Sequence, residues 1–299
     1  MLRRRLDSPG SVLRELARDG TVVLPGAYDA ITARLAEASG SKAIYLSGAG
    51  VTNSMTACPD IAVITLEEMA CHAAYVTDAV SLPVLADADT GFGEVVNVIR
   101  TVREYERAGL AGLHIEDQVS PKRCGHLDGK ELISKQAMCE KIRAACSARH
   151  DPAFLVVART DARGVNGLDD AIDRAQAYVQ AGADAIFPEG LESQDEFRAF
   201  REAVPGLLLA NMTEFGKTPL ISVSEFEALR YNLVIFPMTA FRVMMKAVGE
   251  AYETLLREGT QAGILNKMRT RAELYDLIRY PEYMDLDQRL SYETKTGND

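Results

Sequence analysis

The chain has 299 residues and a formal net charge of −10 at pH 7, with 47% hydrophobic and 25% charged residues. This length suits one α/β barrel, and the composition is typical of a globular protein with a large core. The acidic balance argues against nucleic-acid binding as the main task, because phosphate affinity needs clustered Lys and Arg. It leaves room for an anionic small substrate, which a local group of arginines can bind. No stretch approaches ~20 apolar residues, so we expect no membrane span.

The first residues, 1–5, are basic like the start of a signal peptide, but polar and turn-forming residues follow where an apolar stretch would be needed. We therefore expect a cytoplasmic protein. Five cysteines, at positions 58, 71, 124, 139 and 146, are an odd number without metal-finger spacing. Four of them are expected to be reduced structural thiols. Cys124 differs because of its neighbours.

Eight short apolar runs alternate with longer segments of helical periodicity along the chain. The runs lack strict polar alternation, which is typical of strands buried on both faces of a parallel sheet. No Gly-x-Gly-x-x-Gly follows the first run, so eight β–α repeats favour an α/β (β/α)8 TIM-type barrel over an open nucleotide-binding sheet. The predicted strands are 22–25, 43–47, 83–87, 112–116, 154–158, 185–188, 207–211 and 233–237.

The helical segments between the strands complete the repeats. A short helix at 11–18 precedes the first strand, and residues 264–299 are expected to be a helical or irregular extension. The absence of a linker or composition shift predicts a single domain over 1–299. The predicted helices are 30–39, 66–79, 94–108, 134–148, 168–181, 194–203, 222–228 and 241–257.

Three carboxylates fall at the ends of neighbouring predicted strands. Asp87 and Asp89 close the third run, and Glu116 closes the fourth. Residues two apart on a strand face the same side, so both aspartates are expected to point into the barrel mouth. Crowded carboxylates repel one another unless a cation lies between them, and oxygen ligands suit Mg²⁺ or Mn²⁺. The alternative is a pair of aspartates that cap the next helix.

The segment after the fourth strand, Pro121–His126, is polar and long enough to be a mobile flap. Lys122 and Arg123 stand beside Cys124, where positive charge favours the thiolate, and His126 is a possible proton partner. The alternative is a surface loop with an incidental thiol. The carboxylates one loop away favour a functional role for the cysteine.

Arginines form the third group. Arg159 ends the fifth strand, Arg242 follows the eighth, and Arg271 lies in the C-terminal segment. Guanidinium groups bind carboxylates through two parallel hydrogen bonds, so this set suggests a substrate with two or three carboxylates. Arg159 could instead pair with Asp161 or Glu189.

These motifs resemble a known superfamily. Lys122-Arg123-Cys124-Gly125-His126 resembles the signature of the isocitrate lyase and phosphoenolpyruvate mutase superfamily, and segments 87–93 and 115–118 resemble its metal-binding strands. Within it, the chain is most similar to the 2-methylisocitrate lyases, through 187–189, 211–216, 240–242 and 270–275. The similarity runs from about Pro25 to Tyr283.

The resemblance implies a Mg²⁺-dependent carbon–carbon lyase of propionate breakdown that splits 2-methylisocitrate into pyruvate and succinate. It also implies a barrel with a swapped eighth helix, in a homotetramer built as a dimer of dimers. In this reading Cys124 protonates the departing succinate carbanion, and Tyr45 is a candidate base. The metal is held by Asp87, Asp89 and Glu116. The substrate is bound by Ser47, Gly48, Ala49, Gly125, Arg159, Glu189, Asn211, Met212, Thr213, Arg242 and Arg271.

The loop after the second strand, residues 48–60, is poorer in glycine and small residues than in those enzymes. Because it is expected to border the substrate, the side group next to the cleaved bond stays open. Lyases or hydrolases acting on dimethylmalate or oxaloacetate are alternatives. So is a phosphonomutase acting on carboxyphosphonoenolpyruvate, and a binding or scaffold protein is a non-catalytic alternative.

Overall fold

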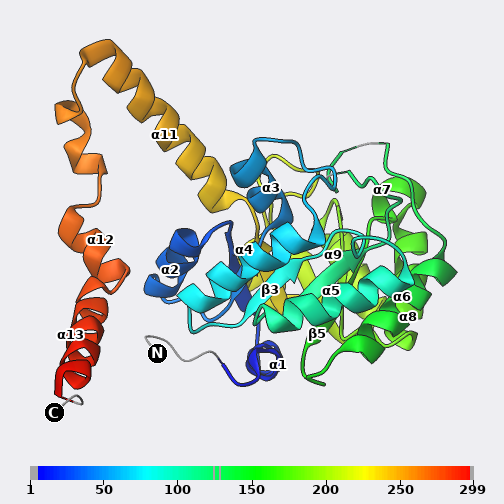
Figure 1. Ribbon diagram of the computed structural model, residues 1–299. Helices are drawn as coiled ribbons and strands as arrows, with labels where there is room; N and C mark the ends of the chain where they lie inside the picture. The colour runs from blue at the N-terminus through cyan, green and yellow to red at the C-terminus, as the bar shows by residue number, and fades with distance from the viewer. Residues whose placement is uncertain (1–5, 124, 128, 297–299) are drawn as a thin grey trace. The chain divides into compact units, whose positions relative to one another are not determined.

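The computed structural model describes residues 6–123, 125–127 and 129–296 (Figure 1). The chain divides into two compact units, one spanning Arg5–Phe241 and the other including Arg242–Asp299. The first unit is a closed barrel of eight parallel strands that follow one another in chain order, which confirms the predicted (β/α)8 barrel. The strands are β1 (Val22–Ala27), β2 (Ile44–Leu46), β3 (Val84–Asp87), β4 (Gly112–Glu116), β5 (Leu155–Thr160), β6 (Ala185–Pro188), β7 (Leu207–Asn211) and β8 (Leu233–Phe236).

The predicted strands and helices match the observed ones to within about two residues at each end. All residues of β3, β4, β5 and β6 are buried, as their continuous apolar runs predicted. Helices α3 and α7 were not predicted. The barrel helices are α1 (Pro9–Asp19), α2 (Ala30–Ala38), α3 (Gly48–Thr56), α4 (Leu66–Ala79), α5 (Val95–Arg107), α6 (Lys135–Ala148), α7 (Arg163–Asn166), α8 (Leu168–Gln180), α9 (Gln194–Ala203) and α10 (Val223–Ala228).

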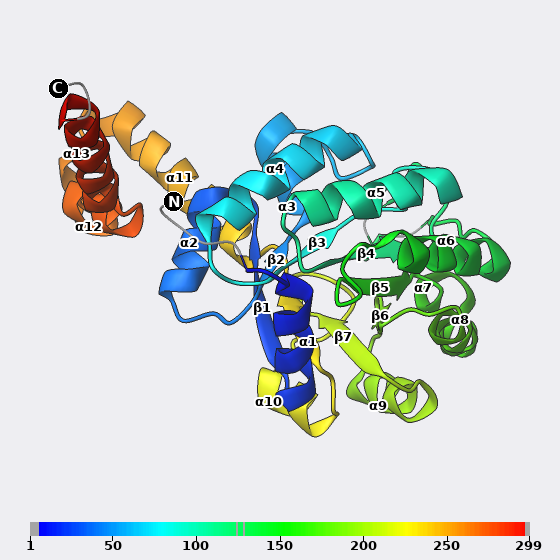
Figure 2. The ribbon, with the colours of Figure 1, turned by 60° about the horizontal axis from the view of Figure 1, so that its bottom comes forward.

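Helix α1 closes the amino-terminal end of the barrel (Figure 2). Its Leu13 and Ala17 are fully buried and join the barrel's inner apolar cluster with residues such as Leu24 and Leu85. Arg14 Nε donates to the carbonyl of Ala153 at 2.7 Å, which fixes the helix to the rim. Helix α1 thus covers the amino-terminal end of the barrel with apolar side chains, and the polar groups lie at the carboxyl ends of the strands.

The second unit is helical. It contains most of α11 (Thr239–Glu258), a 3₁₀ turn η1 (Ala262–Lys267), α12 (Arg271–Leu277) and α13 (Tyr280–Thr296). Several large apolar side chains of α11 are exposed, among them Tyr252 (63%) and Leu256 (89%). Within the described residues, no helix combines the length and apolar character needed to cross a membrane.

Candidate active site

Asp87 and Asp89 lie together at the carboxyl end of β3. Asp87 is the last residue of the strand, and the backbone N–H of Asp89 donates to Asp87 Oδ1 at 2.9 Å. Asp89 itself has a φ of +46° and lies beyond the strand. The two side chains do lie at the same strand end, but the predicted cause, alternation along one strand, is wrong because Asp89 is not in the strand. A left-handed turn after Asp87 brings the carboxylates close.

Lys122 is the cation that faces these carboxylates. Its ammonium group forms an ion pair with Asp89 Oδ1 at 3.0 Å and another with Asp60, and its side chain is only 3% exposed. Burial would lower the pKa of Lys122, but Asp89, Glu116 and the other acids outweigh it and raise that pKa well above its ordinary value. The charge of Lys122 is thus directed into the acidic cluster. Its partners are these carboxylates, whereas the sequence predicts that its charge favours the thiolate of the neighbouring cysteine.

Glu116 and Arg159 form the centre of the cluster. Arg159 Nη1 lies 3.1 Å from Glu116 Oε2, and its Nε and Nη2 both reach Asp161 at 3.0 Å. The alternative prediction that Arg159 pairs with Asp161 and Glu189 describes the structure, since Glu189 Oε2 also lies 3.4 Å from Nη2. Burial raises the pKa of Glu116 well above its usual range despite the guanidinium.

Glu189 is the best-paired acid of the site. Its Oε1 accepts from the N–H of Gly190 at 2.9 Å and lies 3.1 Å from His126 Nε2, and Asn211 Nδ2 reaches Oε2 at 3.2 Å. Burial would raise the pKa of Glu189, but Arg159 and His126 outweigh it and hold that pKa far below its ordinary value. Glu189 is therefore a carboxylate with a fixed orientation.

The acids of this site outnumber its permanent cations. Burial raises the pKa of Asp89 to about 6 against the opposing effect of Lys122, while His114, Lys122 and Arg159 outweigh burial and lower the pKa of Asp87. Asp89 is thus harder to ionise than an exposed aspartate, and a further positive charge nearby would favour its ionised form.

The oxygens of this cluster fit a divalent cation. Asp89 Oδ1 and both carboxylate oxygens of Glu116 are buried acceptors without a geometrically sound hydrogen bond from the described residues. Asp87, Asp89 and Glu116 supply only oxygen ligands, which suit Mg²⁺. No three acidic, histidine or cysteine side chains of the described residues are already gathered into a ligand set.

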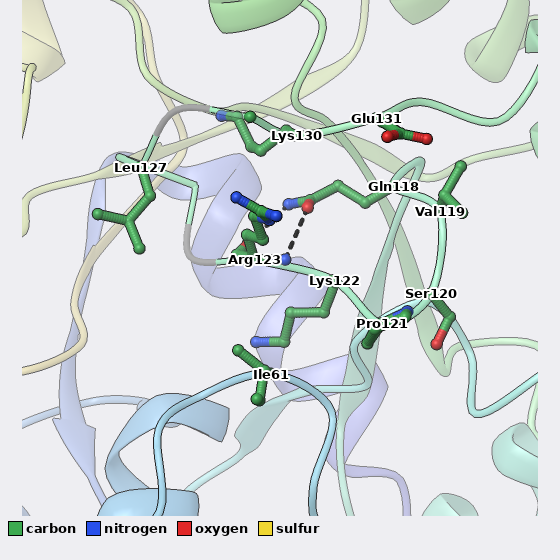
Figure 3. A pocket seen from close by; sticks show the side chains of 11 residues that line it. Ile61, Gln118, Val119, Ser120, Pro121, Lys122, Arg123, Leu127, Lys130 and Glu131 are labelled. Atoms are coloured by element: carbon green, nitrogen blue, oxygen red, sulfur yellow. Dashed lines mark hydrogen bonds between the residues drawn. The ribbon is translucent and has the colours of Figure 1, made fainter.

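Residues 117–123 and 129–133 form the two limbs of a loop beside this site. Its two limbs pair through Val119 N to Glu131 O at 2.8 Å and Ile133 N to Asp117 O at 2.9 Å. The side-chain amide of Gln118 donates to the carbonyl of Arg123 and accepts from the backbone N–H of the same residue. Figure 3 shows the cavity of about 510 Å³ that these limbs line together with Ile61. Cys124 lies outside the described residues, so its predicted role stays a prediction.

Gly125 brings the loop backbone onto the Arg159–Glu189 pair. A Cβ at Gly125 would lie 2.4 Å from Arg159 Nη2 and 2.4 Å from Glu189 Cγ, so any larger residue would push the loop away. The carbonyl of Gly125 accepts from the buried ammonium of Lys130, which also lies 3.1 Å from Asp161 Oδ1. The loop is therefore tied to the acidic cluster on both sides of Gly125.

The residues after β2 form the amino terminus of α3. Ser47 caps this nine-residue helix, and its Oγ accepts from the N–H of Gly50 at 3.1 Å. A Cβ at Gly48 would lie 2.5 Å from Asp87 Oδ2, so glycine is needed for this approach. Ser47, Gly48 and Ala49 thus offer the positive end of a helix dipole beside the acidic cluster.

Tyr45 and His114 lie beneath the cluster inside the barrel. Tyr45 Oη is 2.8 Å from His114 Nε2, the two rings stack at 5.8 Å, and His114 Nε2 is 3.5 Å from Asp87 Oδ1. Burial raises the pKa of Tyr45 well above 10 and lowers that of His114. A neutral phenol and a neutral imidazole result, and His114 is a fully buried, hydrogen-bonded residue of the barrel interior.

The remaining predicted residues divide into two groups. Asn211 and Thr213 lie at the carboxyl end of β7, and the Met212 sulfur accepts from the N–H of Ile221 at 3.4 Å. Arg242 lies in α11 and Arg271 begins α12, both in the second unit. Their roles toward a substrate therefore stay predictions.

Sequence reasoning missed several residues that organise the site. Asp60 and Lys130 were not singled out. Asp117 belongs to the segment 115–118 that was singled out, but its donors, Thr160 Oγ1 at 2.8 Å and Tyr178 Oη at 2.7 Å, were not predicted. The signal that was available is the position of Asp117 directly after Glu116. Long-range partners such as Tyr178 leave no local pattern.

The sequence of this chain is similar to a family model and to known enzymes. Residues 13–256 match the family model for phosphoenolpyruvate phosphomutase. The chain is 54% identical over 292 residues to a 2-methylisocitrate lyase of Aeropyrum pernix, covering 97% of this chain and 94% of that one.

Solved structures agree with this similarity. Oxaloacetate acetylhydrolase bound to 3,3-difluorooxalacetate superposes with a TM-score of 0.90 at 35% identity, covering 96% of this chain and 99% of that one. A 2,3-dimethylmalate lyase, described as a PEP mutase/isocitrate lyase superfamily member, gives 0.90 at 37% identity and covers 96% of each chain. A phosphonopyruvate hydrolase complex with oxalate and Mg²⁺ gives 0.85 at 30% identity, covering 94% and 99%.

Proposed function

Because the chain belongs to the phosphoenolpyruvate phosphomutase and isocitrate lyase family, we propose that it is a lyase that splits 2-methylisocitrate into pyruvate and succinate. The observation that carries this proposal is the 54% identity to a 2-methylisocitrate lyase over 97% of the chain. The fixed carboxylates, the arginine and the helix terminus at the barrel mouth supply the groups that such a reaction needs.

A magnesium ion belongs to this proposal. Asp87, Asp89 and Glu116 would hold it, directly or through water. The buried Asp89 Oδ1 and Glu116 oxygens, which receive no hydrogen bond of sound geometry from the described residues, support the assignment. The Mg²⁺ in the similar phosphonopyruvate hydrolase supports it too. When bound, the ion acts as a Lewis acid that favours the alkoxide of an α-hydroxy acid. Mn²⁺ would satisfy the same oxygen ligands.

The chain's own residues bind the substrate around this centre. Ser47, Gly48 and Ala49 would receive one carboxylate through the hydroxyl group and the backbone N–H groups of α3. Arg159 and Glu189 fix each other and would present a guanidinium edge and a carboxylate to the other end. Asn211 Oδ1 is buried and unsatisfied among the described residues, so it is available to a substrate donor. Gly125, Met212 and Thr213 would border the substrate. Arg242 and Arg271 stay proposed partners of its carboxylates.

The bond change needs one base and one acid. The base removes the proton of the substrate hydroxyl, the carbon–carbon bond breaks, and its electron pair moves to the succinate carbon. Cys124 would then deliver a proton to that carbon and be reprotonated from solvent. Tyr45 is the proposed base, although its raised pKa holds it as a phenol until a partner takes its proton. The phenol proton would pass to His114 Nε2, at 2.8 Å, in the same step in which Tyr45 takes the substrate proton, so that no free phenolate forms.

Replacement of Cys124 by serine tests the acid. A hydroxyl group is a far weaker acid than a thiol at this position, so kcat should fall at least ~10²-fold. Initial rates of pyruvate formation measure the effect. Near-normal turnover of Cys124→Ser would exclude the proton-donor role.

The substrate is tested by an assay for pyruvate, coupled to lactate dehydrogenase, with 2-methylisocitrate at millimolar concentration and with EDTA as the control. Absence of pyruvate would reject the proposal. 2,3-Dimethylmalate and oxaloacetate belong in the same panel, because the structures with a TM-score of 0.90 act on such acids by name. Formation of phosphonopyruvate from carboxyphosphonoenolpyruvate would instead support the phosphonomutase alternative.

We also propose that the protein is a homotetramer in which α11 packs on another subunit. The exposed apolar side chains of α11, including Val243, Met245, Tyr252 and Leu256, support this proposal. Sedimentation equilibrium should give four times the chain mass of 32.6 kDa. A monomer at micromolar concentration would contradict it.

A further inference from the structure

The ring of His126 has one defined orientation, which the proposed reaction does not explain. Its Nδ1 accepts from the backbone N–H of Lys217 at 3.0 Å, and its Nε2 lies 3.1 Å from Glu189 Oε1. A backbone N–H can only donate, so Nδ1 must be the acceptor and the neutral ring must carry its proton on Nε2. That N–H group is buried and lies 3.1 Å from Glu189 Oε1, and no described residue accepts from it in hydrogen-bond geometry. The side chain of His126 is only 10% exposed, so water competes weakly for these contacts.

Gly216 makes room for this ring. A Cβ at Gly216 would lie 2.6 Å from His126 Nδ1 and 2.8 Å from Cε1, closer than real Cβ contacts. Gly216 is followed directly by Lys217, whose N–H meets the same nitrogen. The turn after β7 therefore provides both the space above Gly216 and the N–H donor of Lys217. The His126 ring, from the loop after β4, occupies that space.

Glu189 depends on several groups for its orientation. Its Oε1 receives the N–H of Gly190, and Asn211 and Arg159 approach Oε2. His126 is the contact that comes from the loop beside the site, and Gly125 next to it lies against Glu189 Cγ. The loop thus contacts Glu189 at two neighbouring residues, Gly125 and the His126 ring.

We propose that Gly216 and Lys217 form a seat for His126, and that His126 in this seat is a positioning residue that orients Glu189 toward the substrate. The inference rests on the proposed function in one respect, the role of Glu189 in binding substrate. Its structural part, the seat and the tautomer, is independent of which acid the enzyme cleaves.

A double-mutant cycle tests the seat. Gly216→Ala should lower kcat with 2-methylisocitrate about tenfold or more, because a displacement near 1 Å at a positioned group can cost up to ~10²-fold. In the His126→Ala background the new methyl group has no ring to meet, so Gly216→Ala should change kcat less than about twofold. An equal loss in both backgrounds would overturn the proposal, since the glycine would then act without His126.

Gly20→Ala is the matched control. An added Cβ there meets nothing within 4 Å, and its φ of 165° is ordinary extended backbone. This variant should keep wild-type kcat and KM. A loss in Gly20→Ala as large as that in Gly216→Ala would mean that the assay reports general destabilisation, which would also overturn the assignment of the effect to the seat.

A spectroscopic measurement separates this inference from the proposed function. The chain has four histidines, so long-range ¹H–¹⁵N spectra can be assigned by the signal that His126→Ala removes. At a pH where the ring is neutral, His126 should carry its proton on Nε2, and Gly216→Ala should abolish that single tautomer. A proton on Nδ1 in the wild type would overturn the seat even if 2-methylisocitrate is cleaved. Failure to form pyruvate would overturn the proposed function and leave the tautomer result standing.

Discussion

Replacement of Lys122 by methionine removes the cation on which the acidic cluster depends, while keeping a side chain of similar length. Its ammonium group is 3% exposed and pairs with Asp60 and Asp89. Breaking a buried ion pair from one side leaves an uncompensated charge and typically costs about 3–5 kcal/mol. We expect the free energy of unfolding at pH 8 in EDTA to fall by about that amount.

The loss should depend on pH in a defined direction. Burial already raises the pKa of Asp89 to about 6, and Lys122 opposes that rise. Without Lys122 the folded-state pKa moves higher, whereas the unfolded value stays near ~3.9. The folded state then binds more protons than the unfolded state between these values, so its stability falls as pH rises through that window. The deficit of Lys122→Met should be largest at pH 8 and should shrink toward pH 6.

Urea denaturation at several pH values measures this deficit, and Lys135→Met is the matched control. Lys135 also pairs with an aspartate, Asp173, but both side chains are exposed by 43% and 60%. Such a surface pair contributes at most ~1 kcal/mol. A loss in Lys122→Met no larger than that of the control, or a loss that stays constant from pH 6 to 8, would refute the reasoning.

Two further predictions concern the same end of the barrel. Tyr178→Phe removes the hydroxyl that donates to Asp117 Oδ2 at 2.7 Å, so unfolding should become easier by about 1.5–3 kcal/mol in urea titrations; no change would mean that the other donors satisfy Asp117. Mg²⁺ at about 100 times its Kd should stabilise the wild type by about 2.7 kcal/mol in thermal melts, and Asp87→Asn should lose most of that gain. Equal stabilisation of both proteins would place the ion elsewhere.

The fold could be predicted because its signal is local. Strands such as β5 are buried on both faces, so a run such as Leu155 to Ala158 stays apolar over its whole length. Helix α3 escaped prediction because its sequence, Gly48–Thr56, carries two glycines and small polar residues in place of an amphipathic pattern. Its cap, Ser47, identifies it only after the strand before it is known.

The sequence predicts where the site residues lie better than it predicts which of them form ion pairs. Strand ends located Asp87, Glu116, Arg159 and Glu189 at one edge, and the structure brings them together. Sequence spacing could not show that Lys122 pairs with Asp60, a residue 62 positions away. It also could not show the left-handed turn at Asp89, because that conformation is set by the loop's contacts and is uncommon for a residue other than glycine.

The central claim is that the barrel mouth breaks the carbon–carbon bond of 2-methylisocitrate and protonates the resulting carbanion. Product analysis in D₂O with Mg²⁺ present tests both parts in one measurement. We predict pyruvate and succinate in equal amounts, with one solvent deuterium in each succinate. Absence of pyruvate from 2-methylisocitrate, while oxaloacetate or 2,3-dimethylmalate is cleaved, would contradict the account.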